Sequence, residues 1–304
     1  MEKYLALDIG GTFIKYGLVT SDKEMLEQSK VKTPKTMAGL LDQINELAGF
    51  YPGIAAIAIS APGAVSDSGI IYGFSALPYL HGPNVKELIK ERTGMPVYME
   101  NDANCAAYAE VWGGSAKNKK DVLVIAIGTG IGGAVIKNGT LHKGANLHGG
   151  EFGYMLMTPP VKGKASTWSG VGSTIALVKK VAAAKGLDPE TLSGEEIFSL
   201  AAAGDKICSD AINEFYYFLA VGIYNLQYVY DPELILIGGG ISAREDLMEQ
   251  VNKKLDVIME AVRDAKIRPS IAVCKFRHNA NLLGAVYGFI KEKETAAVLD
   301  QLPK

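Results

Sequence analysis

The chain has 304 residues, of which 48% are hydrophobic and 21% are charged, and its formal net charge is -2 at pH 7. A chain of this length exceeds one core of ordinary size, so we expect two folded domains, and the composition excludes a disordered chain. The near-neutral charge argues against nucleic acid as the main partner, because proteins that bind polyanions carry a basic face.

The three cysteines, Cys105, Cys208 and Cys274, are far apart and have no metal-ligand spacing. A sparse, odd set of cysteines suits free thiols in a reducing compartment. The N-terminal segment lacks the apolar core of a secretion signal, and no run of about 18 apolar residues could span a membrane. We therefore expect a cytoplasmic protein without a membrane partner.

Apolar runs and helix-forming segments alternate through the first half of the chain. The run at 4–9 ends in Gly10-Gly11-Thr12 and a second strand follows at 13–19, which is typical of a β-hairpin with a glycine turn. Further strands are expected at 54–60 and 96–100, and helices at 37–49, 84–93 and about 103–111. Glycine and charge at 113–121 mark a domain boundary, with a first domain at 1–115 and a second at 116–280.

The second half repeats the opening plan, because a strand at 122–127 leads into a glycine turn and a short strand at 134–136. Two such units suggest two similar domains that face each other across a cleft. Alternating strands and helices predict α/β domains with largely parallel sheets. The remaining expected elements are helices at 171–185, 195–203, 205–229 and about 245–259, and a strand at 234–237.

The first glycine turn has the residues of a phosphate site. Gly10 and Gly11 allow the backbone N–H groups to approach phosphate oxygens closely, and Thr12 adds a hydroxyl donor. Asp8 could orient a hydrated Mg²⁺, and Lys15 could add positive charge. A plain hairpin turn is the alternative, since Asp and Gly are common in turns.

The second glycine turn, Gly128–Gly133, matches the glycine pattern of dinucleotide-binding loops. That pattern requires a helix directly after the glycines, whereas residues 134–136 favour a strand. We interpret the segment instead as a second anion-binding turn, with Thr129 as a donor. Gly239 and Gly240 follow a strand and could form a flat surface for adenine or ribose, with a strand-to-helix turn as the alternative.

Asp102 joins the strand at 96–100 to the following helix, at or near the helix N-cap. An N-capping aspartate is the plain alternative. Its place at the carboxyl end of a strand, where open α/β sheets bind ligands, favours a base that accepts a hydroxyl proton. Asn101 could bond a substrate hydroxyl, and so could Glu151, which is bracketed by glycines, although a lone loop glutamate is often only solvated.

Several segments together, in this order, resemble the ROK family of sugar kinases and repressors over nearly the whole chain: DIGGT (8–12), SAPG (60–63), ENDAN (100–104), IGTGIGG (127–133), GGEFGY (149–154) and IGGG (237–240). The resemblance implies an actin-like ATPase (ribonuclease-H-like) fold with two α/β domains around a cleft. It also implies that a C-terminal helix at 281–295 packs back on the first domain, and that the protein forms homodimers.

The resemblance also assigns roles. Asp102 matches the catalytic base, and Gly63, Asn101 and Glu151 match the sugar site, where Tyr154 replaces a histidine of typical members. The phosphate and Mg²⁺ site is matched by Asp8, Gly10, Gly11, Thr12, Thr129 and Gly130, and the adenosine site by Gly239 and Gly240.

Residues 158–170 lack the cysteines of the family's zinc cluster, and a further sugar-contacting glutamate of that segment has no match. We therefore expect ATP and Mg²⁺ but no zinc. The losses leave room for a substituent on O1 of the sugar, and GEFGYM resembles the β-glucoside (cellobiose-type) kinase branch. The expected reaction is ATP-dependent phosphorylation of a β-glucoside or glucose at its 6-hydroxyl, with N-acetylmannosamine and fructose as alternative substrates.

Two non-kinase functions are alternatives. A sugar-responsive repressor would carry a DNA-binding helix-turn-helix ahead of the first hairpin. The hairpin begins at residue 4, so we disfavour this function. A non-catalytic sugar sensor is disfavoured because Asp102 and both phosphate turns are intact.

Overall fold

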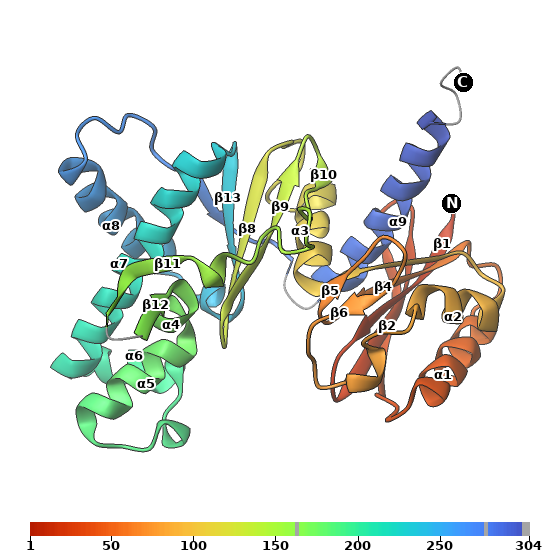
Figure 1. Ribbon diagram of the computed structural model, residues 1–304, viewed down its shortest axis with the longest axis horizontal. Helices are drawn as coiled ribbons and strands as arrows, with labels where there is room; N and C mark the ends of the chain where they lie inside the picture. Colours follow the sequence, from red (N-terminus) through yellow and green to blue (C-terminus); the bar gives the residue numbers. More distant parts are fainter. Residues whose placement is uncertain (162–163, 277–278, 300–304) are drawn as a thin grey trace. The chain divides into compact units, whose positions relative to one another are not determined.

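The computed structural model describes residues 1–161, 164–276 and 279–299, and the chain divides into two compact units (Figure 1). Unit 1 consists of Met1–Asn118, Ile136–Gly149 and Lys275–Lys304, and unit 2 consists of Lys119–Val135 and Gly150–Cys274. The expected domains differ from these units chiefly at 136–149, which belongs to unit 1. Lys162 and Gly163 of the cysteine-free segment lie outside the described residues.

The sheet of unit 1 has the strand order β3-β2-β1-β4-β7, and it contains the expected hairpin, in which Ile9 of β1 pairs with Ile14 of β2. Strands β1, β4 and β7 are parallel to one another, so their carboxyl ends lie at the same edge. The strands are β1 (Lys3–Ile9), β2 (Phe13–Thr20), β3 (Met25–Lys32), β4 (Ala56–Ala61) and β7 (Val97–Asn101).

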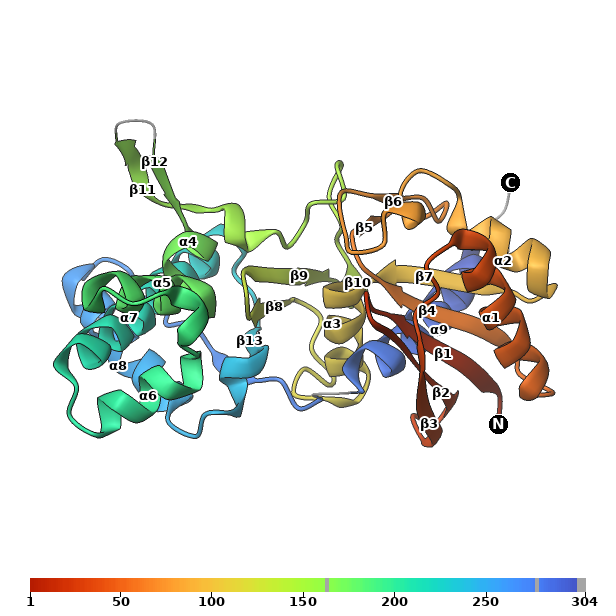
Figure 2. The ribbon, with the colours of Figure 1, turned by 90° about the horizontal axis from the view of Figure 1, so that it is seen from below.

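The two faces of this sheet carry separate hydrophobic cores, because successive side chains of a strand point to opposite faces. Leu5 and Leu7 pack with one pair of helices, whereas Tyr4 and Ala6 pack with another. The first pair is α1 (Met37–Phe50) and α2 (Val85–Thr93), and the second is α3 (Asp102–Gly113) and α9 (Ala280–Leu299). Figure 2 shows α1 and α2 on the opposite side of the sheet from α9. Unit 1 is therefore a three-layer α/β/α sandwich.

Helix α9 corresponds to the expected C-terminal helix, and it packs very closely on α3. A Cβ atom added to Gly284 would lie 1.6 Å from the carbonyl oxygen of Cys105, and one added to Gly288 would lie 2.3 Å from the Tyr98 ring. Glycine allows the two backbones to approach where any side chain would collide. The C-terminal helix is thus held against the strands and helix that form the site described below.

The second sheet has the strand order β10-β9-β8-β13-β14, with β8, β13 and β14 parallel. In unit 2, one core joins this sheet to the helices, and Trp168 is fully buried in it. The strands are β8 (Val122–Ile127), β9 (Ile131–Lys137), β10 (Thr140–Leu141), β13 (Leu234–Gly238) and β14 (Ile271–Val273). The helices are α4 (Trp168–Gly172), α5 (Thr174–Lys185), α6 (Gly194–Ala202), α7 (Lys206–Tyr230) and α8 (Leu247–Ala261).

One expected helix of unit 2 is divided. Ser173 interrupts the helix expected at 171–185, and its hydroxyl accepts a hydrogen bond from the Ala176 amide at 3.1 Å, which caps α5. The shorter elements are β5 (Ala64–Val65), β6 (Ile71–Tyr72), β11 (Leu156–Val161), β12 (Lys164–Thr167), and the 3-10 turns Pro78–Leu80, Phe152–Tyr154, Pro189–Thr191 and Gly240–Ala243. Among the described residues, no helix is both long and apolar enough to cross a membrane.

The close contact of α9 with α3 generates a stability prediction. Gly284→Ala should lower the free energy of unfolding by about 1–3 kcal/mol, because the new methyl group meets backbone that cannot rotate away. Gly49→Ala in α1 is the matched control, since nothing lies within 4 Å of the added Cβ. The control should be neutral or stabilising by up to about 1 kcal/mol. Urea unfolding followed by circular dichroism measures both variants, and equal midpoints would contradict the prediction.

Candidate functional site

Polar side chains gather at the carboxyl ends of the parallel strands of unit 1. In the register of the sheet, Asp8 of β1 lies opposite Ser60 of β4, and Ser60 lies opposite Glu100 of β7. Asp102 follows β7 as the first residue of α3. The structure therefore brings the DIGGT, SAPG and ENDAN segments to the edge at which open α/β sheets bind ligands.

Asp8 is held by two residues that the sequence analysis did not assign to the site, Ser60 and Asn281, and it faces Lys15, which was assigned. Its Oδ1 atom accepts hydrogen bonds from Ser60 Oγ and from Asn281 Nδ2, each at 2.9 Å. Its Oδ2 atom faces the Lys15 ammonium at 3.7 Å. Ser60 could have been found from its place at a strand end, whereas Asn281 comes from α9 and has no local signal in the sequence. One oxygen is thus fixed by neutral donors, and the other faces a cation.

The turn after Asp8 is braced from the end of β3. Gly10 N donates to Phe13 O at 3.1 Å and closes the turn. Thr33 donates to it twice, from Oγ1 to Gly10 O at 2.6 Å and from N to Thr12 O at 3.0 Å. Gly11 and Thr12 are exposed. The turn therefore has a fixed backbone and can be approached from solvent.

Asn101, and not Asp102, is the N-cap of α3. Asn101 Oδ1 accepts hydrogen bonds from Ala103 N at 2.9 Å and Asn104 N at 3.2 Å. Its Nδ2 atom donates to Gly63 O at 3.0 Å, which ties the SAPG turn to the start of the helix. Asp102, expected at or near the cap, is the first residue of the helix, directly after the cap. Because Asn101 satisfies the helix terminus, the Asp102 carboxylate is not required for capping.

The Asp102 carboxyl has a raised pKa. The residue keeps access to solvent, yet the protein crowds around it, and this desolvation is the largest cause of the shift. The Ala103 amide donates to Asp102 Oδ1 at 2.8 Å and opposes the shift, while the nearby Asp8 carboxylate raises the pKa further. A carboxylate with a raised pKa is a stronger base than an ordinary aspartate.

The glycine turn of unit 2 joins β8 to β9. Gly128 N donates to Gly130 O at 2.9 Å, and Ser169 Oγ accepts from Ile131 N at 2.9 Å just beyond the turn. Thr129 and Gly130 are exposed. A strand follows the glycines, so the sequence-based rejection of a dinucleotide-binding loop is confirmed.

Gly239 and Gly240 lie beside this turn, because β13 is the parallel neighbour of β8. Gly239 has a φ of 84°, and an added Cβ would lie 2.1 Å from Ile127 O. This close approach to β8 requires glycine at 239 whether or not a ligand binds. Gly240 has open space around its Cβ position and begins a 3-10 turn.

Glu151 and Tyr154 belong to unit 2 and lie on a turn anchored against β9. Phe152 is buried there, and a Cβ added to Gly153 would lie 2.0 Å from Ile131 O. Both Glu151 and Tyr154 are exposed, with 74% of the tyrosine accessible. The buried anchor therefore holds an acidic and an aromatic side chain toward solvent.

Among the described residues, no group of three or more His, Cys, Asp or Glu side chains is placed to hold a metal directly. This leaves the expected lack of zinc a prediction. Asp8 fits the role of orienting a hydrated Mg²⁺. Both of its hydrogen bonds go to Oδ1, and Oδ2, which lies 3.7 Å from Lys15 Nζ, is the oxygen that would accept from a water ligand of the ion.

Comparisons with known proteins cover nearly the whole chain. The ROK family profile matches residues 4–292. A β-glucoside kinase of Listeria innocua is 37% identical over 298 residues, which cover 96% of this chain and 98% of that protein. A ROK family protein of Streptococcus pneumoniae, solved with sucrose, is 36% identical with a TM-score of 0.90, covering 96% and 99% of the two chains. A ROK family glucokinase of Streptomyces griseus, solved with glucose and AMPPNP, is 26% identical with a TM-score of 0.73, covering 93% and 97%.

The charge on Asp8 generates a prediction about Asp102. Asp8→Asn removes a like charge, so the pKa of the Asp102 carboxyl should fall toward its ordinary value. Carboxyl ¹³C NMR titration of aspartate-labelled protein measures this pKa in both forms. Asp22→Asn, in an exposed turn, is the matched control and should leave it unchanged. An Asp102 pKa that stays constant or rises in Asp8→Asn would contradict the electrostatic account.

Proposed function

The chain belongs to the ROK family, and we propose that it is an ATP-dependent kinase that phosphorylates a hexose or hexoside at the 6-hydroxyl. Its two α/β units have the actin-like ATPase fold expected from the sequence. One observation carries the proposal: a carboxylate with a raised pKa lies at the ligand-binding edge of a parallel sheet, beside a glycine turn and a second aspartate. The names of the relatives support the same activity.

In unit 1, Asp102 accepts the proton of the sugar hydroxyl while the oxygen of that hydroxyl attacks the γ-phosphorus of ATP. The proton moves to the carboxylate, the new P–O bond forms, and ADP leaves. Base catalysis of this kind supplies about 10²–10⁴ of the rate. Asn101 and Gly63 bind sugar hydroxyls, supported by the hydrogen bond that joins them. Because Asn101 is itself fixed as the cap of α3, the sugar oxygen is positioned with little loss of entropy.

Each unit also supplies groups for the nucleotide. In unit 1, Gly10, Gly11 and Thr12 present a braced backbone turn to phosphate oxygens, with Lys15 as a cation. Asp8 would hold Mg²⁺ through water, and that ion would neutralise charge on the phosphates. In unit 2, the exposed turn with Thr129 and Gly130 suits phosphate, and the neighbouring Gly239 and Gly240 suit adenosine.

For the sugar itself, we favour a β-glucoside such as cellobiose, with glucose next. Glu151 contributes a carboxylate for sugar hydroxyls, and Tyr154 offers a broad aromatic surface in place of the family's histidine. The similarity to β-glucoside kinases supports this preference. N-acetylmannosamine and fructose are the alternatives. We also propose, from the family resemblance, a homodimer that contains no zinc.

The role of Asp102 is tested by Asp102→Asn. The variant should bind sugar and ATP as tightly as the wild type, because the amide keeps the shape of the carboxylate, but its kcat should fall by about 10²–10⁴. Calorimetry measures binding, and coupled ADP release measures turnover. Asp188→Asn, at the N-cap of a 3-10 turn in unit 2, is the matched control and should keep full turnover. Near-normal turnover of Asp102→Asn would reject the proposed base.

The substrate preference is tested by kcat/KM for cellobiose, glucose, N-acetylmannosamine and fructose, with ATP and Mg²⁺ in excess. We expect kcat/KM for cellobiose to equal or exceed that for glucose, because the residues expected to close the pocket around O1 are missing. A value for cellobiose far below that for glucose or N-acetylmannosamine would disprove the β-glucoside preference while leaving the kinase activity intact. Phosphorylation of none of the four sugars would reject the kinase itself.

A further inference from the structure

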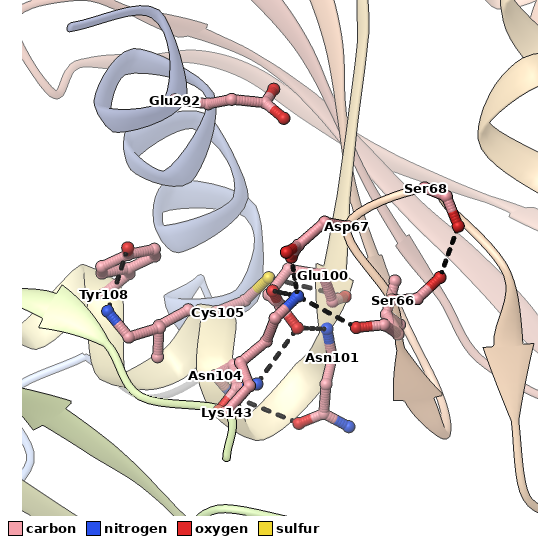
Figure 3. A network of polar contacts seen from close by, with 12 residues as sticks. Ser66, Asp67, Ser68, Glu100, Asn101, Asn104, Cys105, Tyr108, Lys143 and Glu292 are labelled. Atoms are coloured by element: carbon pink, nitrogen blue, oxygen red, sulfur yellow. Dashed lines mark hydrogen bonds and ion pairs between the residues drawn. The ribbon is translucent and has the colours of Figure 1, made fainter. Parts of the chain in front are cut away.

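An ion pair with a buried carboxylate joins Glu100, two residues before the candidate base in the sequence, to Lys143 (Figure 3). Glu100, near the end of β7, is only 3% exposed, and its Oε2 atom lies 3.1 Å from Lys143 Nζ. Lys143 follows β10 and reaches the carboxylate from a segment more than forty positions away in the sequence. Buried charges are costly unless they are paired and hydrogen-bonded, so we expect the remaining polar atoms of both side chains to have hydrogen-bond partners nearby.

The second oxygen of Glu100 connects the pair to the site. Glu100 Oε1 accepts hydrogen bonds from Asn101 N at 2.8 Å and from Asn104 Nδ2 at 3.0 Å. Asn101 is the residue before Asp102, and Asn104 lies in the first turn of α3. One carboxylate therefore holds the backbone on one side of Asp102 and a side chain on the other.

The ammonium group of Lys143 has acceptors for all three of its protons. Besides Glu100, it donates to Val65 O at 3.0 Å and contacts Asp67 Oδ1 at 2.5 Å. Val65 and Asp67 follow Gly63 along the chain, in and after β5. Lys143 thus links the segment that carries Gly63 to the strand that carries Asn101, in parallel with the direct bond between those two residues.

These contacts show whether Lys143 binds a ligand itself or holds other residues of the site in place. Burial lowers the pKa of its ammonium, but the Glu100 and Asp67 carboxylates more than offset this, so that the pKa is raised and the group stays protonated. Its three donors are already directed at protein oxygens, so it is not available to grip a phosphate. The same segment lines a cavity of about 550 Å³ together with Lys86, Glu292 and Tyr108, in which the charged groups are of both signs. The contacts therefore favour a structural effect on the site over ligand binding.

We propose that Lys143 is a positioning residue: by neutralising Glu100, it allows that carboxylate to hold Asn101 and α3 so that Asp102 and Asn101 face the sugar hydroxyl. The proposal rests on the proposed kinase function. Without the cation, the buried Glu100 carboxylate would remain near Asp102 without a counter-ion. Glu100 would then turn toward water to keep its charge solvated, and this movement releases the Asn101 amide.

Lys143→Met tests the proposal, because it keeps a long unbranched side chain and removes its charge. We expect kcat/KM for the sugar to fall by about 10- to 100-fold, since small displacements of reacting groups have effects of this size. The KM for ATP should stay within about twofold, because the proposed nucleotide contacts lie on other elements. Lys86→Met is the matched control: it loses an ion pair with Glu292 on the same cavity but does not touch Glu100, and it should keep wild-type kinetics.

A double variant that also removes the charge of Glu100 distinguishes a positioning role of Lys143 from a general loss of structure. In Lys143→Met/Glu100→Gln the unpaired charge is absent and the introduced amide keeps an oxygen acceptor, so kcat/KM should recover by about tenfold over Lys143→Met alone. Losses that simply add in the double variant would overturn the proposal. So would wild-type kinetics in Lys143→Met, or an equal loss in Lys86→Met.

Hydrogen exchange of the Asn101 amide gives a readout that does not depend on activity. Its protection should fall in Lys143→Met and return in the double variant, because this N–H donates to Glu100. Unchanged protection in Lys143→Met would overturn the positioning role even if turnover falls. A wild-type protein without turnover on any sugar would reject the kinase function, and the exchange measurement would still decide whether Lys143 orders Asn101. If Lys143→Met alone does not fold, a folded double variant supports the pairing, and an unfolded one contradicts it.

Discussion

The parallel register of β1, β4 and β7 is the constraint on which the site of unit 1 depends. It places Asp8, Ser60 and Glu100 in one row, so segments separated by about fifty and forty positions meet at one edge. The helix that follows β7 must then be capped at the same edge. Because Asn101 provides the cap, the carboxylate of Asp102 lies at the N-terminus of α3 but is not needed to cap it.

The three acidic groups at this edge have different surroundings. Neutral donors from β4 and α9 fix Asp8, the ammonium of the partly buried Lys143 balances Glu100, and desolvation raises the pKa of Asp102. Asp8 and Asp102 still repel each other, which adds to the raised pKa of Asp102. The C-terminal helix is part of this arrangement, because its close packing at Gly284 places Asn281 against Asp8.

Local patterns in the sequence predicted much of this arrangement. The first hairpin, the strand after the second glycine turn and the helix after Asn101 follow from glycine placement and apolar periodicity. Strand β3 was missed because it is an outermost strand of the sheet. Most of its residues are exposed, so no alternation of buried and exposed positions marks it in the sequence. Asn281 and Lys143 were missed as site residues because their partners are distant in sequence and are known only from the tertiary fold, whereas Ser60, at the end of a strand, could have been found. The break at Ser173 depends on a single side-chain cap, which periodicity does not register.

At this edge of the sheet, we propose, a phosphoryl group is transferred to a primary sugar hydroxyl. The most direct measurement is ³¹P NMR of the protein with ATP, Mg²⁺ and cellobiose or glucose carrying ¹³C at carbon 6. We expect ADP together with a sugar phosphomonoester whose phosphorus couples to the labelled carbon. A phosphate on the anomeric oxygen, or inorganic phosphate as the sole product beside ADP, would contradict it.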